Sequence, residues 1–371
     1  MIEKILGKNK IIADKAIEYY GVINRRLPKF LRWKPLYYLL FITNKCNLNC
    51  VYCWQKVDEK DKDIGVFHGS ELLPEEWIKF INNLSFPSVL VFTGGEPLLY
   101  DGFKQIIGNI PSRNFVSINT NGIALNEDYS KQFVDKNIHN ISISLDGFQD
   151  ISTRGRKEDF NKIVHNINVL NEVKKLKRKK KPLLTIKTSI TDDVVDQLEA
   201  FCEFCDNELN ANTIVIQLVK TLHHAQFSFR VYKKLSDLMT AGTPMSYKYQ
   251  RSEEIVDSLC HLIKKYSSRR MSIEIFPKLK TKEQFQRYFD QQGIDVYKKC
   301  NMPWSMITVL PSGDVVPCFS LSLGNIKEFN YNINTTVFKK RHEGFYRDFG
   351  IDQSGDHTPP YCNCCCYLVG R

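Results

Sequence analysis

Three cysteines stand within eight positions near the N-terminal end of the chain, in the segment NKCNLNCVYC: Cys46, Cys50 and Cys53. A tetrahedral zinc and a fully protein-bound [4Fe–4S] cube both need four ligands, whereas three thiolates leave one iron of a cube open. No fourth ligand follows closely, because the next histidine is His68. The C-x3-C-x2-C spacing also differs from the paired C-x2-C knuckles of a zinc ribbon. It therefore favours an iron–sulfur cube whose open iron could chelate an amine and a carboxylate.

A second group of cysteines lies toward the C-terminus and comprises Cys300, Cys318, Cys362, Cys364, Cys365 and Cys366. Cys362 and Cys365 are the favoured pair, because an i, i+3 turn aims both sulfurs inward as in metal knuckles. A shift in register would bring in Cys364 and Cys366 instead. Four protein ligands leave no open iron, so we expect electron transfer at this site. Zinc is the alternative, since four cysteines suit either metal.

The composition of the 371 residues is that of a folded protein without a membrane span: 43% are hydrophobic and no apolar run approaches 18 residues. The N-terminus lacks a signal peptide, so we expect a cytoplasmic protein with reduced thiols. The formal charge of +11 includes the run KKLKRKKK at 174–181, which we interpret as a solvated helix end rather than a site for an anionic partner. Nucleic-acid binding is not expected, because no aromatic residue interrupts this run. Cys202 and Cys205 have helical apolar spacing and are expected to be buried thiols.

Elements that could position these cysteines alternate along the chain. Six β-type runs are expected, at 36–42, 88–92, 115–119, 140–145, 183–189 and 213–219. Helical patterns lie between them, at 74–84, 102–110, 127–136, 158–175 and 194–208. This alternation predicts an α/β fold with a partial (βα)6 TIM-like barrel. A β-hairpin is expected around the Pro-Ser-Gly-Asp turn at 311–314, with Asp314 as a turn residue. The expected domains are a basic helical extension (1–35), the partial barrel (36–220), a helical bridging region (221–295) and a small cysteine-rich domain (296–371).

The motifs at the strand ends resemble those of the radical S-adenosylmethionine (SAM) superfamily. ITNKCNLNCVYC is similar to the cysteine loop that follows the first strand of these enzymes. TGGEP (Thr93–Pro97), NTNG (Asn119–Gly122) and SLDG (Ser144–Gly147) follow the next three strands in the same order as in the family. Ligands in parallel barrels bind at the carboxyl ends of strands, where all four motifs lie. The resemblance covers 36 to about 220.

Further site residues are implied by this resemblance alone. It places Gly95 and Glu96 around the SAM amino group, Tyr52 beside the adenine and Ser144 near the ribose. It also matches Arg154 with a family position that pairs with the SAM carboxylate. The resemblance extends to Asn121 and Gln217, each of which could instead only cap a strand end.

The C-terminal cysteines resemble the auxiliary-cluster domains of radical SAM enzymes, called SPASM and, in a shorter form, twitch. Six cysteines from Cys300 onward are one short of the seven in a full SPASM domain, which favours one auxiliary [4Fe–4S] cluster held by Cys300, Cys318, Cys362 and Cys365. The implied function is a radical SAM oxidoreductase of the dehydrogenase type. Its 5′-deoxyadenosyl radical would abstract hydrogen from a small molecule, and the auxiliary cluster would take the second electron.

The sequence leaves the substrate and the partners open. A peptide maturase of the ribosomal-peptide or sulfatase type is the alternative, against which stand the few residues before the first strand. An iron–sulfur electron carrier or a zinc- and RNA-binding protein leaves the GGEP, NTNG and SLDG motifs unexplained. His223, beside His224, is a candidate catalytic residue, although an exposed loop position is equally consistent with the sequence. A flavodoxin or ferredoxin is the expected electron donor.

Overall fold

The computed structural model describes residues 19–24, 26–28, 35–50, 53, 69–84, 87–148, 157–218, 248–290, 302–317 and 321–348. Its centre is a nine-stranded sheet in the order β7-β6-β5-β4-β3-β2-β1-β8-β9. The strands are β1 (Tyr37–Phe41), β2 (Val89–Thr93), β3 (Phe115–Thr120), β4 (Asn140–Ser144), β5 (Leu183–Ile190), β6 (Thr213–Leu218), β7 (Ser272–Phe276), β8 (Met306–Val309) and β9 (Val315–Val316). The first six are the six strands expected from the sequence.

All neighbours from β7 through β8 pair in parallel, and only β8 and β9 are antiparallel. The strand order starts at β7 and ends at β9, so within the described residues the sheet does not close on itself. The expected partial barrel is confirmed. It is extended beyond six strands by β7 at one edge and by β8 and β9 at the other.

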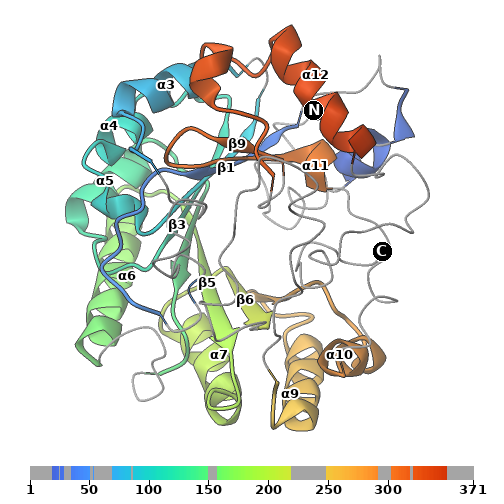
Figure 1. The fold of residues 1–371 in the computed structure, drawn as a ribbon. Coiled ribbons are helices and arrows are strands. Elements are labelled where there is room, and N and C mark those ends of the chain that lie inside the picture. Colours follow the sequence, from blue (N-terminus) through green and yellow to red (C-terminus); the bar gives the residue numbers. More distant parts are fainter. Residues whose placement is uncertain are drawn as a thin grey trace.

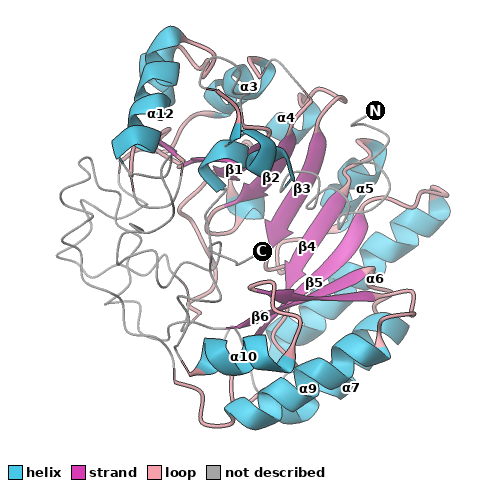
Figure 2. Ribbon diagram, turned by 90° about the vertical axis from the view of Figure 1, so that its right-hand side faces the viewer, coloured by secondary structure: helices cyan, strands magenta, loops and turns pink. Residues whose placement is uncertain are grey.

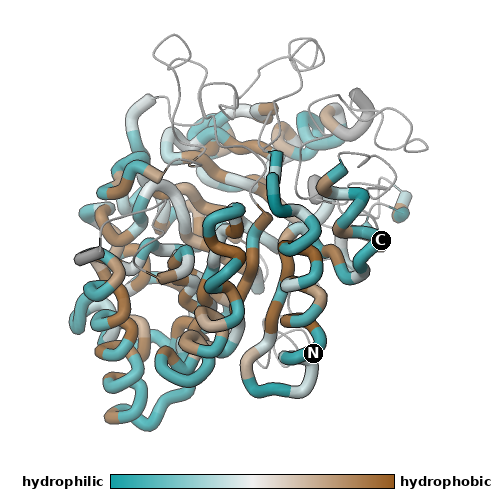
Figure 3. The backbone as a smooth tube through the Cα atoms, turned by 90° about the horizontal axis from the view of Figure 1, so that it is seen from below, coloured by the Kyte–Doolittle hydropathy of each residue, from teal (hydrophilic) through white to brown (hydrophobic). Residues whose placement is uncertain are grey.

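Helices cover the outer face of the sheet (Figures 1 and 2). They are α3 (Pro74–Asn82), α4 (Phe103–Gly108), α5 (Glu127–Asp135), α6 (Lys157–Leu176), α7 (Leu198–Asn207), α9 (Ser252–Lys265) and α10 (Lys282–Phe289). The five helices expected between the strands are α3 to α7, and their positions are confirmed. Figure 3 shows the hydrophobic stretches of the chain inside and the hydrophilic residues along the outer helices.

The two faces of the strands differ in polarity. Leu90, Ile118, Ile141, Ile186 and Ile214 point toward the helices and are fully buried. The alternate positions of β3, β4 and β5 carry a polar network instead. In it, Asn140 Nδ2 donates to Ser117 Oγ (3.0 Å) and to Ser142 Oγ (2.9 Å), and Thr185 Oγ1 donates to Asn140 Oδ1 (2.8 Å). Strands covered by helices on both faces are usually apolar throughout. The alternation therefore marks an inner face suited to polar ligands.

The C-terminal elements pack on the barrel rather than apart from it. They are α11 (Met302–Ser305), β8, β9, η7 (Ile326–Phe329) and α12 (Thr336–Asp348). β8 extends the sheet beside β1, and Lys327 Nζ lies 3.0 Å from Glu76 Oε1 on α3. The expected hairpin is present and is formed by β8 and β9. Asp314 is a turn residue as expected, and it accepts a hydrogen bond from Ser312 Oγ at 2.8 Å. Residues 19–24 are helical, and the buried Asn24 donates to Trp304 O at 2.9 Å.

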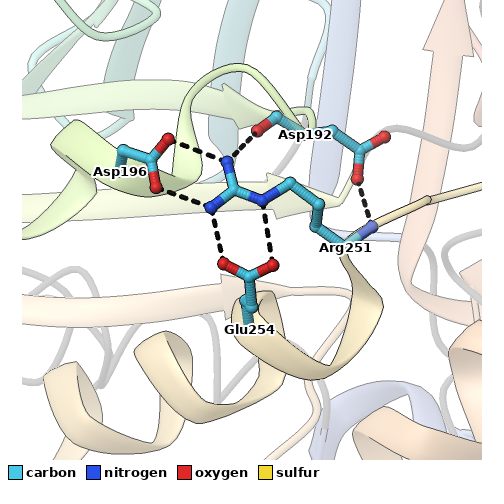
Figure 4. A network of polar contacts seen from close by, with 4 residues as sticks. All are labelled: Asp192, Asp196, Arg251 and Glu254. Carbon is cyan, nitrogen blue, oxygen red and sulfur yellow. Dashed lines mark hydrogen bonds and ion pairs between the residues drawn. The ribbon is translucent and has the colours of Figure 1, made fainter.

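A polar network holds the start of α9 against the loop that follows β5 (Figure 4). The Arg251 guanidinium donates two hydrogen bonds to Asp196 (2.8 and 2.6 Å) and two to Glu254 (3.0 and 2.5 Å). The backbone N–H of Arg251 donates to Asp192 Oδ1 at 2.9 Å. These bonds fix one wall of the barrel at the carboxyl end of β5.

Other expectations concern surface and core. The basic run is a helix end: α6 stops at Leu176, residues 177–180 are exposed, and Lys177 pairs with Asp135 at 2.5 Å. Cys202 and Cys205 lie on α7 and are fully buried in the core, and burial raises the pKa of Cys202 to about 12. Among the described residues no helix has both the length and the hydropathy that crossing a bilayer requires.

Candidate functional site

The first cysteines lie in the loop that leaves β1 at its carboxyl end. Cys46 is exposed, Cys50 is buried, and Cys53 is half-buried with its N–H donating to Cys50 O at 3.1 Å. Although the Cys46 residue is exposed, partial desolvation of its thiol raises the thiol pKa; the backbone hydrogen bond from Leu48 acts to lower it, and the charges of Glu96 and Cys53 raise it further. We call residues 43–53 the cysteine loop. Because this loop leaves β1 at its carboxyl end, its three thiols lie at the end of the barrel at which parallel barrels bind ligands.

The two glycines of the GGEP motif let the cysteine loop approach β2 closely. A Cβ on Gly94, whose φ is +142°, would lie 2.6 Å from Thr43 O, and a Cβ on Gly95 would overlap the carbonyl of Lys45. The backbone N–H of Gly95 donates to Thr43 O at 2.8 Å, and that of Glu96 donates to Lys45 O at 2.7 Å. A side chain at either glycine would break this contact.

The Glu96 carboxylate joins the second motif to the third. It is fully buried and accepts hydrogen bonds from Leu98 N (3.0 Å), Thr120 Oγ1 (2.6 Å) and Asn121 N (2.7 Å). Burial raises the pKa of Glu96 to about 7, although these three hydrogen bonds act to lower it. A cationic ligand group beside it would favour the charged carboxylate.

The side chain of Asn121 contacts the cysteine loop directly. Its Nδ2 donates to Asn47 Oδ1 at 2.8 Å, between Cys46 and Cys50 in the sequence, and its Oδ1 accepts from Ile123 N at 3.0 Å. The sequence left open whether Asn121 binds a cofactor or caps a strand end. The described contacts are those of a strand end that holds the loop.

Ser144 and Gln217 lie farther along the sheet. Ser144 is the half-buried last residue of β4, and its partner in register on β5 is Lys187. Lys187 Nζ donates to Asn119 Oδ1 at 2.9 Å, which places a positive charge at this level of the barrel. Gln217 is half-buried on β6 and pairs in register with Ser189 and Phe276.

Sequence reasoning missed Glu71, which contacts the loop. Glu71 Oε1 accepts hydrogen bonds from Thr43 Oγ1 at 2.9 Å and from Asn44 N at 2.6 Å. Thr43 could have been noticed, because it directly follows a strand and precedes the first cysteine. Glu71 carries no such signal, since it belongs to no motif and to no strand or helix.

The remaining candidates lie outside the described residues. These are Tyr52, Arg154, His223, His224, Cys300, Cys318, Cys362, Cys364, Cys365 and Cys366. Two features of the hairpin at 311–314 are described. Gly313 has a φ of +91°, and Asn325 Nδ2 donates to Ser312 O at 2.8 Å.

The described thiols do not form the ligand set of a single metal ion. In the described part of the chain, no three His, Cys, Asp or Glu side chains converge on a position that one metal ion could fill. A mononuclear zinc requires such convergence, whereas in a cube each thiolate binds a different iron. That Cys46, Cys50 and Cys53 hold three irons of a cube stays a prediction.

Two family models match the chain. The model of the Radical SAM superfamily matches residues 40–187, and the SPASM model of an iron–sulfur cluster-binding domain matches residues 300–366. The chain carries a radical SAM domain. Its barrel is the domain that binds SAM and a [4Fe–4S] cluster, and its C-terminal part is a SPASM-type domain for auxiliary iron–sulfur binding.

Curated relatives of this radical SAM protein act on different substrates, to judge by their names. A cysteine-type anaerobic sulfatase-maturating enzyme of Clostridium novyi is 35% identical over 147 residues, 36% of this chain and 39% of the relative. The sporulation killing factor maturation protein SkfB of Bacillus subtilis is 29% identical over 51% of this chain and 43% of the relative. A probable GTP 3′,8-cyclase of Methanococcus maripaludis is 25% identical over 59% of this chain and 72% of the relative. The chain thus spans less than half the length of the first two.

Solved structures share the fold. SuiB of Streptococcus suis bound to S-adenosylmethionine superimposes with a TM-score of 0.56 at 13% identity, over 83% of this chain and 65% of that chain. Native anSMEcpe with bound AdoMet gives a TM-score of 0.54 at 16% identity, over 89% of this chain and 94% of that chain. At these identities the likeness shows a shared fold.

Proposed function

We propose that this protein is an enzyme that cleaves SAM reductively and uses the resulting radical to abstract a hydrogen atom from a peptide substrate. The observation that carries the proposal is the joining of three motifs at one end of the barrel: Glu96 and Asn121 both bond to the cysteine loop. When bound at Cys46, Cys50 and Cys53, the cluster would supply the electron that breaks the C–S bond of SAM to give methionine and a 5′-deoxyadenosyl radical.

The chain's own residues would bind and orient SAM. The Glu96 carboxylate is buried, and its backbone N–H bonds to Lys45 O of the loop, so an amino group of SAM beside it would favour its charged form. Ser144 would lie near the ribose, and Gln217 would lie farther along the inner face of the barrel. Gly95 has no side chain and so leaves room for the Lys45 carbonyl of the cysteine loop. Tyr52 and Arg154 are proposed for the adenine and the SAM carboxylate. The barrel would exclude water from the radical.

A peptide substrate is favoured by the named relatives. Two of them mature a sulfatase or a sporulation killing factor, and neighbours of the same fold have been crystallised with peptides: SuiB with the precursor SuiA, and anSMEcpe with Cp18Cys. These names favour a peptide maturase over the dehydrogenase of small molecules that the sequence alone suggests. Loss of two hydrogen atoms, with the auxiliary cluster of Cys300, Cys318, Cys362 and Cys365 accepting the second electron, would suit either substrate.

A small-molecule substrate is the second candidate. The relatives named GTP 3′,8-cyclases favour it, and so does the positive charge of Lys187 on the inner face, which could meet an anionic group. His223 is retained as a candidate proton donor or acceptor for either substrate.

The test starts from anaerobically reconstituted protein reduced with dithionite in place of the proposed flavodoxin or ferredoxin. It should convert SAM to 5′-deoxyadenosine and methionine, slowly even without substrate, and a variant with Cys46, Cys50 and Cys53 changed to Ala should not. Formation of S-adenosylhomocysteine instead would indicate methyl transfer and overturn the proposal. Peptides and nucleotides offered in parallel distinguish the two substrate classes. Only the true substrate should accelerate the formation of 5′-deoxyadenosine, and only its own mass should change.

A further inference from the structure

A short segment, residues 69–73, lies between the cysteine loop and the hairpin of the C-terminal domain. We call it the connecting segment. On one side, Leu72 N donates to Pro311 O at 2.7 Å, and the Leu72 side chain would lie 3.1 Å from a Cβ placed on Gly313. Tyr100 OH donates to Leu72 O at 2.5 Å and so ties the same residue to the barrel. The connecting segment is therefore fixed at both its backbone groups and its buried side chain.

On the other side, the connecting segment reaches the cysteine loop through one carboxylate oxygen. Glu71 Oε1 accepts from the Thr43 hydroxyl and from Asn44 N, and the same hydroxyl accepts from Lys45 N at 3.1 Å. The three residues directly before Cys46 are thus held, directly or through one hydroxyl, by Glu71.

These bonds are of the stronger kind. A hydrogen bond to an ionised carboxylate contributes more than a neutral one, and at 2.6 Å the bond from Asn44 N is short. Thr43 is fully buried, so its hydroxyl would lose a partner if the carboxylate were removed. These bonds form between protein groups alone, and they fix the backbone directly before Cys46, the first cysteine of the loop.

We propose that Glu71 is a positioning residue for the SAM-binding cluster. It fixes residues 43–45 so that Cys46 is presented at a constant place, and it does so from a segment anchored on the auxiliary domain. Asn121 holds the loop from the opposite flank, beyond Cys46. The inference deepens the proposed function and rests on it, because the group being positioned is the cluster that binds SAM.

The experiment compares three variants in the full-length, anaerobically reconstituted protein. Glu71→Ala removes the acceptor, and Glu71→Gln keeps an oxygen that can accept both bonds. Glu75→Ala is the matched control, since Glu75 is a nearby carboxylate of α3 that accepts only from the exposed Gln105 at 3.0 Å in the described structure. Three quantities are measured: the Kd of SAM by equilibrium dialysis, the rate of iron loss to a chelator, and KM and kcat of SAM cleavage without substrate.

We expect Glu71→Ala to weaken SAM binding and raise KM about five- to tenfold, the loss of roughly one good hydrogen bond, and to accelerate iron loss. Glu71→Gln should restore most of the wild-type behaviour, and Glu75→Ala should match the wild type. Thr43→Val combined with Glu71→Ala should give less than the sum of the two single effects, because both remove the same bond.

A Glu71→Ala protein with wild-type SAM affinity and wild-type iron loss would overturn the inference, whatever its melting temperature. Should Glu71→Ala not fold, Thr43→Val tests the hydroxyl bond alone: wild-type SAM affinity and iron loss in Thr43→Val would overturn the claim that the Thr43 bond helps to position Cys46. Failure of the proposed function is distinguishable, because wild-type protein would then not cleave SAM at all. The rate of iron loss still separates the Glu71 and Glu75 variants in that case.

Discussion

Asn121 Nδ2 donates to Asn47 Oδ1 at 2.8 Å, so the end of β3 holds the middle of the cysteine loop. The backbone N–H of the same Asn121 donates to the buried Glu96, whose own N–H donates to Lys45 O. The contacts form a closed circuit through three motifs that are far apart in the sequence. A change at any of these residues should therefore be felt at the loop between Cys46 and Cys50.

Asn121→Ala should accelerate iron loss from the first cluster and weaken SAM binding several-fold. The physical reason is the loss of one side-chain hydrogen bond, about 0.5–1.5 kcal/mol, at a loop that the cluster must keep in place. Iron release to a chelator and SAM dialysis measure the two effects. Asn109→Ala is the control, because Asn109 is an exposed residue that caps α4. Equal behaviour of the two variants would mean that the Asn47 contact does not hold the loop.

Much of the barrel could be predicted because each strand carries its own signal. β3 and β4 alternate apolar with polar residues, and the order of the motifs follows the order of the strands. The joining of the motifs could not be predicted in the same way. The resemblance places Gly95 near the SAM amino group, and the structure adds a second reason for a glycine there, because a Cβ would overlap the Lys45 carbonyl.

The contribution of Glu71 also could not be predicted, for a different reason. Its partners lie 27 and 28 positions earlier in the sequence, and no periodicity relates a loop carboxylate to them. Likewise, the pairing of β8 with β1 depends on the whole sheet, since an edge strand accepts any suitable partner. Local patterns thus specify elements, whereas side-chain contacts between loops need the folded chain.

The iron content tests the cofactors directly. Reconstituted protein should hold about eight irons, from one SAM-binding cube and one auxiliary cube, and replacing Cys46, Cys50 and Cys53 by Ala should halve this number. Iron and sulfide assays with Mössbauer spectroscopy make the measurement. About four irons in the intact protein would remove the auxiliary cluster, and about twelve would show that the C-terminal domain holds two.

His139 should make the protein less stable in mild acid. Burial, with the nearby charge of Lys181, lowers the pKa of His139 to about 4, below its ordinary value of 6.5. The unfolded chain therefore takes up a proton that the folded chain refuses, and stability is lost as the pH falls from about 6.5 toward 4. Melting of cluster-free protein across this range should show a shallower slope for His139→Gln. An unchanged slope would assign the acid sensitivity to other groups.

Arg251 should stabilise the wall of the barrel more than an ordinary surface pair does. It bonds to two carboxylates and so links α9 to the loop after β5, whereas Arg287 pairs only with Glu283 on its own helix among the described contacts. Exposed ion pairs contribute little singly, but a network that joins separate elements contributes more. Arg251→Ala should thus lower the melting temperature clearly more than Arg287→Ala, and added salt should narrow the difference. Equal melting temperatures would contradict this role.

Glu96 should give the cluster-free protein the opposite pH dependence from His139. Its pKa is raised to about 7 from an ordinary 4.5 because the carboxyl is buried, so the folded chain retains a proton that the unfolded chain releases. The stability from this residue is complete below about pH 4.5 and is lost as the pH rises through 7. Glu96→Gln should remove that slope, while the exposed Glu127→Gln should not.

Glu96→Gln also turns an amide NH2 toward groups that already donate, Asn121 N or Thr120 Oγ1, which should cost about 1–3 kcal/mol of unfolding free energy. Urea titrations from pH 5 to 8 measure both effects. A Glu96→Gln protein as stable as the wild type, with the same slope, would show that the carboxylate does not join the loops as its three hydrogen bonds indicate.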